Sequence, residues 1–294
     1  MILIVISLFL SLSSPVVVER CSSLSRVLPN QFLFLSSSLS CNASDRTFLF
    51  YTFDKSGGTS AYDSMQQLRS TLWKPVHRVT YQDRILYDRN GGMHLGRFRA
   101  FTQVVAGMMD LPVFRSTHFV TAILLREPVS RAISEYFFRQ QHSKHSRLLG
   151  LHPNESLMEH SVTFSNFVTK RLSSAVQTCA KTHHASKVDY FLCIENQPRA
   201  LLEETCDHVL EHFETLFSVV LILEDIPKST ALLAQLLDIP DFRLPQSNRG
   251  YMHQAVSQET MQQLAEINDL DMRIYSRALA IFHRQQLPLE NHRL

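Results

Sequence analysis

The sequence lacks an excess of charge of either sign. Its 29 lysine and arginine residues and 27 aspartate and glutamate residues leave a formal net charge of +2. Proteins that wrap nucleic acid present a strongly basic surface, so this balance gives no indication of a nucleic-acid partner and none is predicted, while a local basic pocket for a small anion stays compatible with it. Because 45% of the 294 residues are hydrophobic and 19% are charged, the chain can bury one substantial core.

The sequence also lacks the spacing of ligands that a metal site needs. It contains 14 histidines, yet His142 with His145, and His183 with His184, lie in polar stretches without a cysteine or carboxylate at ligand spacing. No metal is therefore predicted.

The first charged residue is Glu19, so that residues 1–18 form a nearly uninterrupted apolar segment. Its length lies between a signal-peptide core and the roughly 20 residues that span a bilayer, which leaves a cleaved signal peptide and an uncleaved signal anchor both open. Residues 19–45 are rich in serine and predict a stem or linker. We expect one folded domain over residues 46–286 and a tail over 287–294.

Two glycosylation sequons begin at Asn42 and Asn154, which fits exposure in the lumen of the secretory pathway. Five cysteines are compatible with an oxidising compartment, and one of them must stay unpaired within the chain. Pairing of Cys193 with either Cys179 or Cys206 would close a short loop, and buried free thiols are the alternative.

Three apolar runs predict buried strands, and the chain has no internal repeat. The runs are 47–53, 118–125 and 217–224, and the helical patterns that follow them run through Arg69, from Val129 to about Gln141 and from about Ser229 to Leu237. Pro128 stands at the first helical position of the second helix, where its missing N–H costs nothing. Fully apolar strands that alternate with helices predict a single α/β domain with a parallel sheet covered on both faces, which binds ligands beyond the carboxyl ends of its strands.

Two other segments complete the predicted organisation of the chain. Residues 257–285 carry one long amphipathic helical pattern that closes the chain. Residues 142–187 are polar and rich in histidine, with only a weak helix near 161–175, so we interpret them as an insertion that shapes access to the site.

The loop KSGGTS (55–60) lies between the first strand and its helix and is suited to a phosphate. Its glycines let the backbone approach an anion, and the helix N-terminus favours negative charge. The lysine precedes the glycines, whereas nucleotide triphosphatases have it after them, which argues against a kinase or ATPase. The alternative is an ordinary glycine turn capped by Thr59 or Ser60.

A second anion-binding element follows the strand 118–125. Arg126 stands at the strand exit, and Ser134 lies eight residues further, two turns into the helix. The guanidinium offers a fixed fork to phosphate oxygens, and the serine hydroxyl adds a directed donor. The alternative is a surface arginine and a serine on a solvated helix face.

Together these motifs resemble the Golgi carbohydrate sulfotransferase family. KSGGTS after a strand, followed by LLREPVSRAISEYFF (124–138), is similar to that family's phosphosulfate-binding loop and 3′-phosphate-binding motif. LILEDIPKSTALLAQLL (221–237) and AEINDLDMRIYSRALAIF (265–282) resemble its closing segments, so the resemblance covers residues 47–283. Within the family, GGMHLGRF (91–98) looks nearest to heparan sulfate 2-O- and 6-O-sulfotransferases and related uronyl and galactose enzymes.

The resemblance implies a P-loop-type parallel sheet flanked by helices and transfer of a sulfuryl group from 3′-phosphoadenosine 5′-phosphosulfate (PAPS) to a glycan hydroxyl, without a metal. It implies a single-pass protein of the Golgi membrane with a lumenal catalytic domain, or alternatively a secreted one. The 5′-phosphosulfate would be held by Lys55, Ser56, Gly57, Gly58, Thr59 and Ser60, and the 3′-phosphate by Arg126 and Ser134. The nucleotide would be covered by a loop containing Arg249, for which a plain turn is the alternative.

For catalysis we expect Lys55 at the leaving oxygen and His94 as the base, since neutral imidazole accepts a proton near neutral pH. Glu127 and Glu135 are the rival bases. Arg97 and Arg99, which lie close to His94 in the sequence, are candidates to contact an anionic glycan, and solvated surface arginines are the alternative.

The loop departs from the family's proline-lysine-threonine-glycine, because Asp54 precedes Lys55 and Ser56 follows it. An acidic residue beside an anion site keeps a non-catalytic lumenal glycan- or nucleotide-binding protein as an alternative. A P-loop phosphotransferase, with Asp225 as magnesium ligand, is the other. The acceptor and the oligomeric state stay open.

Overall fold

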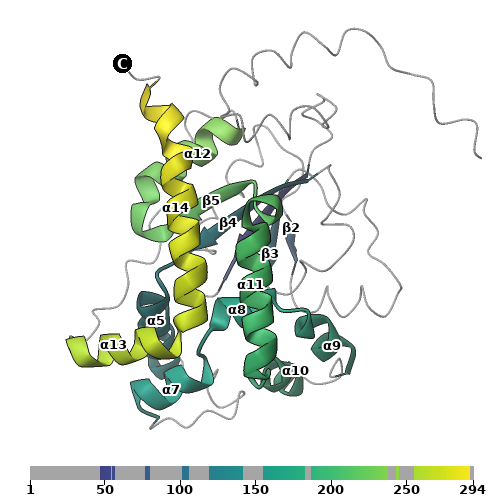
Figure 1. The fold of residues 1–294 in the computed structure, drawn as a ribbon, viewed down its shortest axis with the longest axis vertical. Coiled ribbons are helices and arrows are strands. Elements are labelled where there is room, and N and C mark those ends of the chain that lie inside the picture. The colour runs from purple at the N-terminus through teal and green to yellow at the C-terminus, as the bar shows by residue number, and fades with distance from the viewer. Residues whose placement is uncertain are drawn as a thin grey trace, which may run out of the picture.

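The computed structural model places a five-stranded parallel sheet at the centre of the chain (Figure 1). It describes residues 47–53, 55–56, 77–79, 101–105, 119–141, 155–182, 187–237, 243–244 and 255–291. The strands are β1 (Thr47–Thr52), β2 (His77–Val79), β3 (Phe101–Val105), β4 (Phe119–Leu125) and β5 (Val219–Ile222). Every neighbouring pair in the order β2-β3-β1-β4-β5 is parallel, which confirms the predicted α/β fold class.

The strand order sets where a ligand can bind. From β1 the chain goes to β2 and β3 on one side of the sheet, then crosses to β4 and β5 on the other. The order therefore reverses between β1 and β4, and ligands of open α/β sheets bind at such a switch point, beyond the carboxyl ends of the strands. Thr52 pairs with Leu124 at this edge, so β1 and β4 end side by side.

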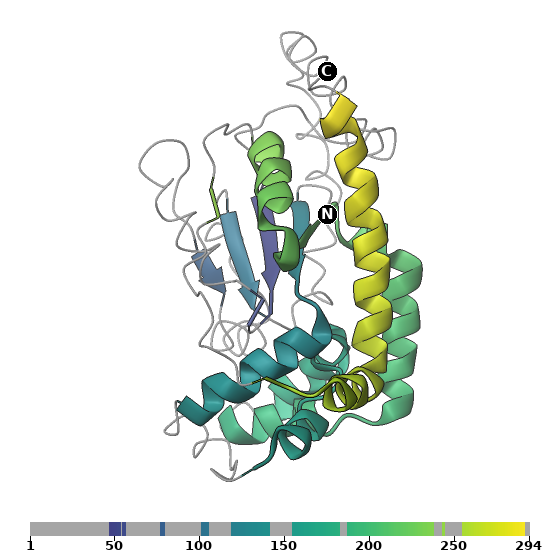
Figure 2. The ribbon, with the colours of Figure 1, turned by 90° about the vertical axis from the view of Figure 1, so that its left-hand side faces the viewer.

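The described residues form the helices that pack around the sheet. They are α5 (Pro128–Gln141), α7 (Leu157–Thr163), α8 (Phe167–Leu172), α9 (Ala175–Thr182), α10 (Lys187–Glu195), α11 (Arg199–Leu216), α12 (Ile226–Leu237), α13 (Gln258–Ile267) and α14 (Asp269–Asn291). In Figure 2, α12 lies in front of the strands, and α11 and α14 stand side by side to their right. Within the described ranges, no helix combines the length and apolar composition that a membrane span requires.

The main core joins one face of the sheet to α8, α11 and α14. Alternate residues of the strands point into it, and it contains Tyr51, Phe53, Ile123, Leu125, Val220, Ile222, Phe167, Phe213, Ile274 and Phe282. The intervening residues Ala122, Leu124, Val219 and Leu221 are also buried. Burial on both faces explains why β4 and β5 are continuous apolar runs without a polar alternation.

Several predicted elements differ from the structure. Residues 142–187 were expected to form an insertion with one weak helix; that prediction is wrong, because α7, α8 and α9 form there and α8 enters the core. The single helix expected over 257–285 is broken at Asn268, the C-cap of α13. The strand predicted over 217–224 is shorter in the structure, because β5 ends at Ile222 and Leu223–Asp225 form a 3₁₀ turn. The strands β2 and β3 and the helix α11 were not predicted.

The N-termini of α8 and α14 cap each other. The carboxylate of Asp271 accepts hydrogen bonds from the N–H groups of Val168 and Thr169, at 2.9 and 2.8 Å, and from the Thr169 hydroxyl at 2.8 Å. In return, the side-chain oxygen of Asn166 accepts from the N–H groups of Leu270 and Asp271, at 3.0 and 3.2 Å. Burial raises the pKa of Asp271, against the opposing influence of Arg131 and these hydrogen bonds. The arrangement locks the two helices together.

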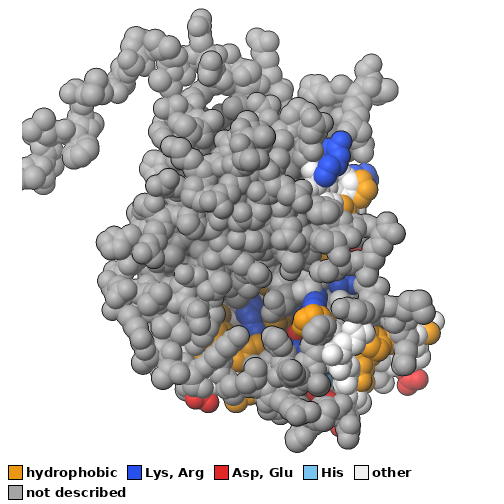
Figure 3. All heavy atoms as spheres, turned by 180° about the vertical axis from the view of Figure 1, so that it is seen from behind, with side chains coloured by type: hydrophobic (Ala, Val, Ile, Leu, Met, Phe, Trp, Pro, Cys, Tyr) orange, Lys and Arg blue, Asp and Glu red, His pale blue; other side chains and the backbone are white. Residues whose placement is uncertain are grey.

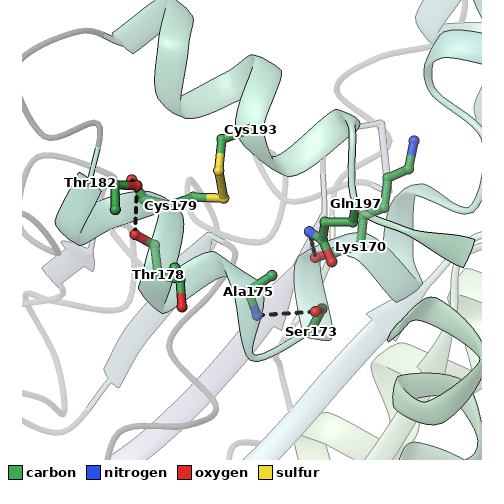
Figure 4. The surroundings of a disulfide bond; sticks show 8 residues. All are labelled: Lys170, Ser173, Ala175, Thr178, Cys179, Thr182, Cys193 and Gln197. Atoms are coloured by element: carbon green, nitrogen blue, oxygen red, sulfur yellow. Dashed lines mark hydrogen bonds between the residues drawn. A yellow bond between two sulfur atoms is a disulfide. The ribbon is translucent and has the colours of Figure 1, made fainter. Parts of the chain in front are cut away.

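A disulfide joins α9 to α10 (Figure 4). It links Cys179 to Cys193, which is one of the two pairings that the sequence left open, and Cys206 is a free, buried thiol. Burial raises the pKa of Cys206 to about 11, so this thiol is unreactive at physiological pH. Just after α10, Gln197 donates a hydrogen bond to the Lys170 carbonyl of α8 at 3.1 Å, which ties the disulfide-linked pair to the core.

We expect Asp271→Ala to lower the free energy of unfolding by about 3 kcal/mol or more, because two N–H groups and a hydroxyl lose their buried acceptor. Urea unfolding followed by circular dichroism measures this change. Ser276→Ala is the matched control, since this exposed hydroxyl donates only to Met272 within α14, and its change should stay within about 0.5 kcal/mol. Equal effects of the two substitutions would refute the capping role.

We expect peptide mapping without reduction to recover a peptide pair that joins Cys179 to Cys193. Replacing both residues by alanine should lower the free energy of unfolding by about 3 kcal/mol, the value for a cross-link that closes a loop of this length. Recovery of Cys206 in a disulfide would contradict the structure.

Candidate functional site

The first part of the site is the turn that follows β1. The Ser56 N–H donates to the Phe53 carbonyl at 3.1 Å and closes the turn. Lys55 has a φ of 64°, in the left-handed region that costs a residue other than glycine about 1–2 kcal/mol. Such strained residues cluster at functional sites.

Ser56 presents a buried polar group at this strand end. Its side chain is fully buried, and its hydroxyl has no hydrogen-bond partner among the described residues. Leaving a buried hydroxyl unpaired costs about 1–3 kcal/mol. A ligand oxygen at the end of β1 would satisfy it, which fits the anion that the loop motif predicts.

Arg126, at the end of β4, reaches this turn. Its Nη1 donates a hydrogen bond to the Lys55 carbonyl at 3.0 Å, across 71 residues of sequence. Burial lowers the pKa of Arg126, and the nearby Glu224 and Glu127 oppose that effect. The guanidinium remains charged at any physiological pH. The two predicted anion-binding elements therefore meet at the switch point between β1 and β4.

Helix α5 begins directly beyond Arg126. The Glu127 carboxylate accepts from the N–H groups of Val129 and Ser130, at 2.9 and 2.7 Å, and so caps the helix. Pro128 is its first residue, as predicted. The second rival base, Glu135, lies in a buried ion pair with Arg139 at 2.5 Å. Both carboxylates are thus engaged by groups of their own helix.

The Lys55 side chain packs on α5. Its ammonium lies over the ring of Phe138, 2.8 Å from the ring centroid. Ser134 precedes Phe138 by four residues, which places both on one face of the helix. The half-buried Ser134 thereby lies on the face of α5 that meets the turn after β1.

Buried arginine and lysine side chains connect helices α5, α8 and α10. The guanidinium of Arg131 stacks on Phe167 at 4.5 Å, and that of Arg171 packs on the same ring at 4.3 Å. Arg171 and Lys170 share the buried carboxylate of Glu195, at 2.6 and 3.2 Å. On the back of the molecule, Lys and Arg side chains of the described residues emerge beside hydrophobic ones (Figure 3). The buried Arg131 is a packing residue of the core through its contact with Phe167.

His160 of α7 lies beside the same helix. Its ring packs against Phe164 and Tyr136, with centroids 4.6 and 5.6 Å apart. Burial and the nearby Arg139 and Arg131 lower the pKa of His160 to about 3, so this histidine is neutral and structural.

Other predicted site residues lie outside the described residues: Gly57, Gly58, Thr59, Ser60, His94 and Arg249, together with Asp54, Arg97 and Arg99. Their roles stay predictions. The structure adds Phe138, Glu224 and Tyr275, to which the sequence assigned no role. Asp225, the magnesium ligand of the phosphotransferase alternative, accepts from the Lys228 N–H at 3.2 Å at the start of α12. Among the described side chains, no group of three or more His, Cys, Asp or Glu could hold a metal ion.

The comparison with known families agrees with this architecture. Residues 58–276, more than half of the chain, match the model described as the sulfotransferase family, and the chain belongs to that family. The match includes Arg126 and Ser134 and begins just after Lys55 and Ser56. It relates the chain to the family as a whole and does not distinguish the Golgi carbohydrate subtype. A search of curated proteins finds no match.

We expect Lys55→Gly to be more stable than Lys55→Ala by about 1 kcal/mol, because both remove the ammonium but only glycine adopts the left-handed conformation without strain. Denaturant unfolding of the two variants measures the difference. At Lys228, inside α12, the same pair should differ in the opposite direction by about 1 kcal/mol. Equal stability of the two Lys55 variants would show that the turn is not left-handed in solution.

Proposed function

We propose that this member of the sulfotransferase family transfers a sulfuryl group from PAPS to a hydroxyl of a glycan. The observation that carries the proposal is the 3.0 Å hydrogen bond from Arg126 to the Lys55 carbonyl, which joins both anion-binding elements at the switch point. The family match covers sulfuryl transfer; the donor, the acceptor and the residue roles below are the proposal.

The described residues fit a donor with two separate anionic groups. The buried Ser56 hydroxyl and the strained Lys55 suit the 5′-phosphosulfate at the end of β1. A guanidinium has five N–H donors, and the bond to the Lys55 carbonyl occupies one of them, so that Arg126 can still offer its fork to the 3′-phosphate. Ser134, on the same helix, adds a hydroxyl. The short distance between the two elements matches one nucleotide that bridges them.

The proposed chemistry needs a cation at the leaving oxygen and a base at the acceptor. PAPS supplies an activated sulfuryl group: its bond from sulfur to the bridging oxygen breaks, and a bond from sulfur to the acceptor oxygen forms. Lys55 stabilises the charge that develops on the leaving oxygen, and its contact with Phe138 keeps the ammonium on the side of the site. His94 takes the proton of the acceptor hydroxyl. Adenosine 3′,5′-bisphosphate is the other product.

Location in the lumen of the secretory pathway, where we place the glycan acceptor, is supported by independent features of the chain. The disulfide between Cys179 and Cys193 favours an oxidising compartment. The apolar residues 1–18 and the sequons at Asn42 and Asn154 point to the same route. Within this proposal, residues 1–18 attach the protein to the membrane or are cleaved, and Arg97 and Arg99 contact the anionic glycan.

A second candidate is a lumenal protein that binds the nucleotide without transferring sulfate. The acidic residue Asp54 directly precedes Lys55, and this is the feature that favours the alternative. Retained nucleotide binding without transfer would identify it.

We expect the full chain to transfer radiolabelled sulfate from PAPS to one member of a glycan panel: desulfated heparan, chondroitin and galactose-terminated glycans. Ser134→Ala and Arg126→Lys should each raise the KM for PAPS roughly ten- to hundred-fold, the loss of about 1.5–3 kcal/mol for a hydrogen bond to a charged group. Ser276→Ala, which removes an exposed hydroxyl on α14, is the matched control and should keep the wild-type KM. Binding of adenosine 3′,5′-bisphosphate without transfer would favour the second candidate, and absence of binding would overturn the proposal.

A further inference from the structure

A chain of hydrogen bonds connects the ends of three strands to the C-terminal helix. Glu224 follows β5, and its Oε1 accepts from the Glu127 N–H at 3.1 Å. Its Oε2 accepts from the hydroxyl of Tyr275, on α14, at 3.1 Å. Arg126, one residue before Glu127, donates to the Lys55 carbonyl after β1. Glu224 thus has a donor on each oxygen, one from the β4–α5 junction and one from α14.

This arrangement fixes the start of the Arg126 side chain. The Glu127 N–H belongs to the peptide that links it to Arg126, so the hydrogen bond to Glu224 holds the plane of that peptide. The guanidinium is held at its other end by the Lys55 carbonyl. Two anchors, one on the backbone and one on the side chain, therefore determine where the arginine fork points.

The same contacts restrain the Glu224 carboxylate. Glu224 and Arg126 interact electrostatically, yet the hydrogen bonds of the Glu224 carboxylate in the described part of the chain go to Glu127 and Tyr275, and that of Arg126 goes to Lys55. Burial and the neighbouring Glu224 raise the pKa of Tyr275, so that its phenol stays protonated and donates at every physiological pH. If the phenol were absent, Oε2 would lose its donor and the carboxylate could turn toward the guanidinium.

We propose that Tyr275 and Glu224 are positioning residues for Arg126: the Tyr275 hydroxyl holds the Glu224 carboxylate on the Glu127 backbone, which directs the guanidinium to the 3′-phosphate and prevents Glu224 from competing with it. The inference rests on the proposed function, because it takes the 3′-phosphate of the donor as the ligand of Arg126. A carboxylate beside an anion site is otherwise unfavourable. The two donors to Glu224, the Glu127 N–H and the Tyr275 hydroxyl, explain why this site tolerates it.

The test compares adenosine 3′,5′-bisphosphate with 5′-AMP by calorimetric titration of the full chain. Tyr275→Phe removes only the hydroxyl, and the ring stays packed against the core. We expect this variant to bind the bisphosphate about ten-fold more weakly and 5′-AMP as the wild type does, with a similar rise in the KM for PAPS at unchanged kcat. Adding Glu224→Gln to Tyr275→Phe removes the competing charge and should restore most of the bisphosphate affinity.

The controls separate this inference from the function on which it rests. Ser276→Ala, at the next position of α14, should change neither affinity, and thermal unfolding shows whether each variant is folded. A wild type that binds both nucleotides equally overturns the proposed function and this inference with it. A Tyr275→Phe variant that keeps the wild-type preference overturns the inference alone, as does an equal loss for both nucleotides or no restoration by Glu224→Gln.

Discussion

The parallel pairing of β1 with β4 is the constraint on which the site depends. Because Thr52 and Leu124 are partners, the residues beyond the two strands leave the sheet side by side. Arg126 can then reach the Lys55 carbonyl although 71 positions separate them in sequence. A shift of the register by one pair would move the guanidinium by about 3.3 Å and break that bond. The register is itself fixed by the apolar side chains that both strands bury in the common core.

The helices keep that edge in place through buried polar contacts. Asp271 and Asn166 cap each other's helices, and Arg131 of α5 stacks on Phe167 beside them. Buried ion pairs such as that of Arg171 with Glu195 add little net stability, because removing both charges from water costs about as much as their attraction returns. They do restrict the alternatives, since any other packing would leave these charges unpaired. These contacts hold helix α5, which carries Ser134 and Phe138.

The sequence predicted those elements whose local residue pattern matches their burial in the structure. Residues 121–125 of β4 are buried on both faces of the sheet, which agrees with the continuous apolar run in the sequence, and Pro128 marks the start of α5. The prediction failed over 142–187 because α8 buries Thr169, Lys170 and Arg171, whose partners Asp271 and Glu195 lie far along the chain. A helix rich in polar residues is predicted to be exposed to solvent unless the partners of its buried side chains are known. The contact between Tyr275 and Glu224 spans 51 residues and likewise has no local signal.

The charge balance at the strand ends explains how the proposed anion site can include two carboxylates. Glu127 accepts from the first N–H groups of α5, and Glu224 accepts from the Glu127 N–H and from Tyr275. Each negative charge is thus directed at a donor that is fixed by the fold, and the helix N-terminus disperses the charge of Glu127. The field of the two carboxylates favours the charged form of Arg126 in a partly buried place, where desolvation opposes it. These neighbours oppose the effect of burial on the pKa of Arg126 while their carboxylates bind other donors, which leaves the arginine fork available to the proposed phosphate.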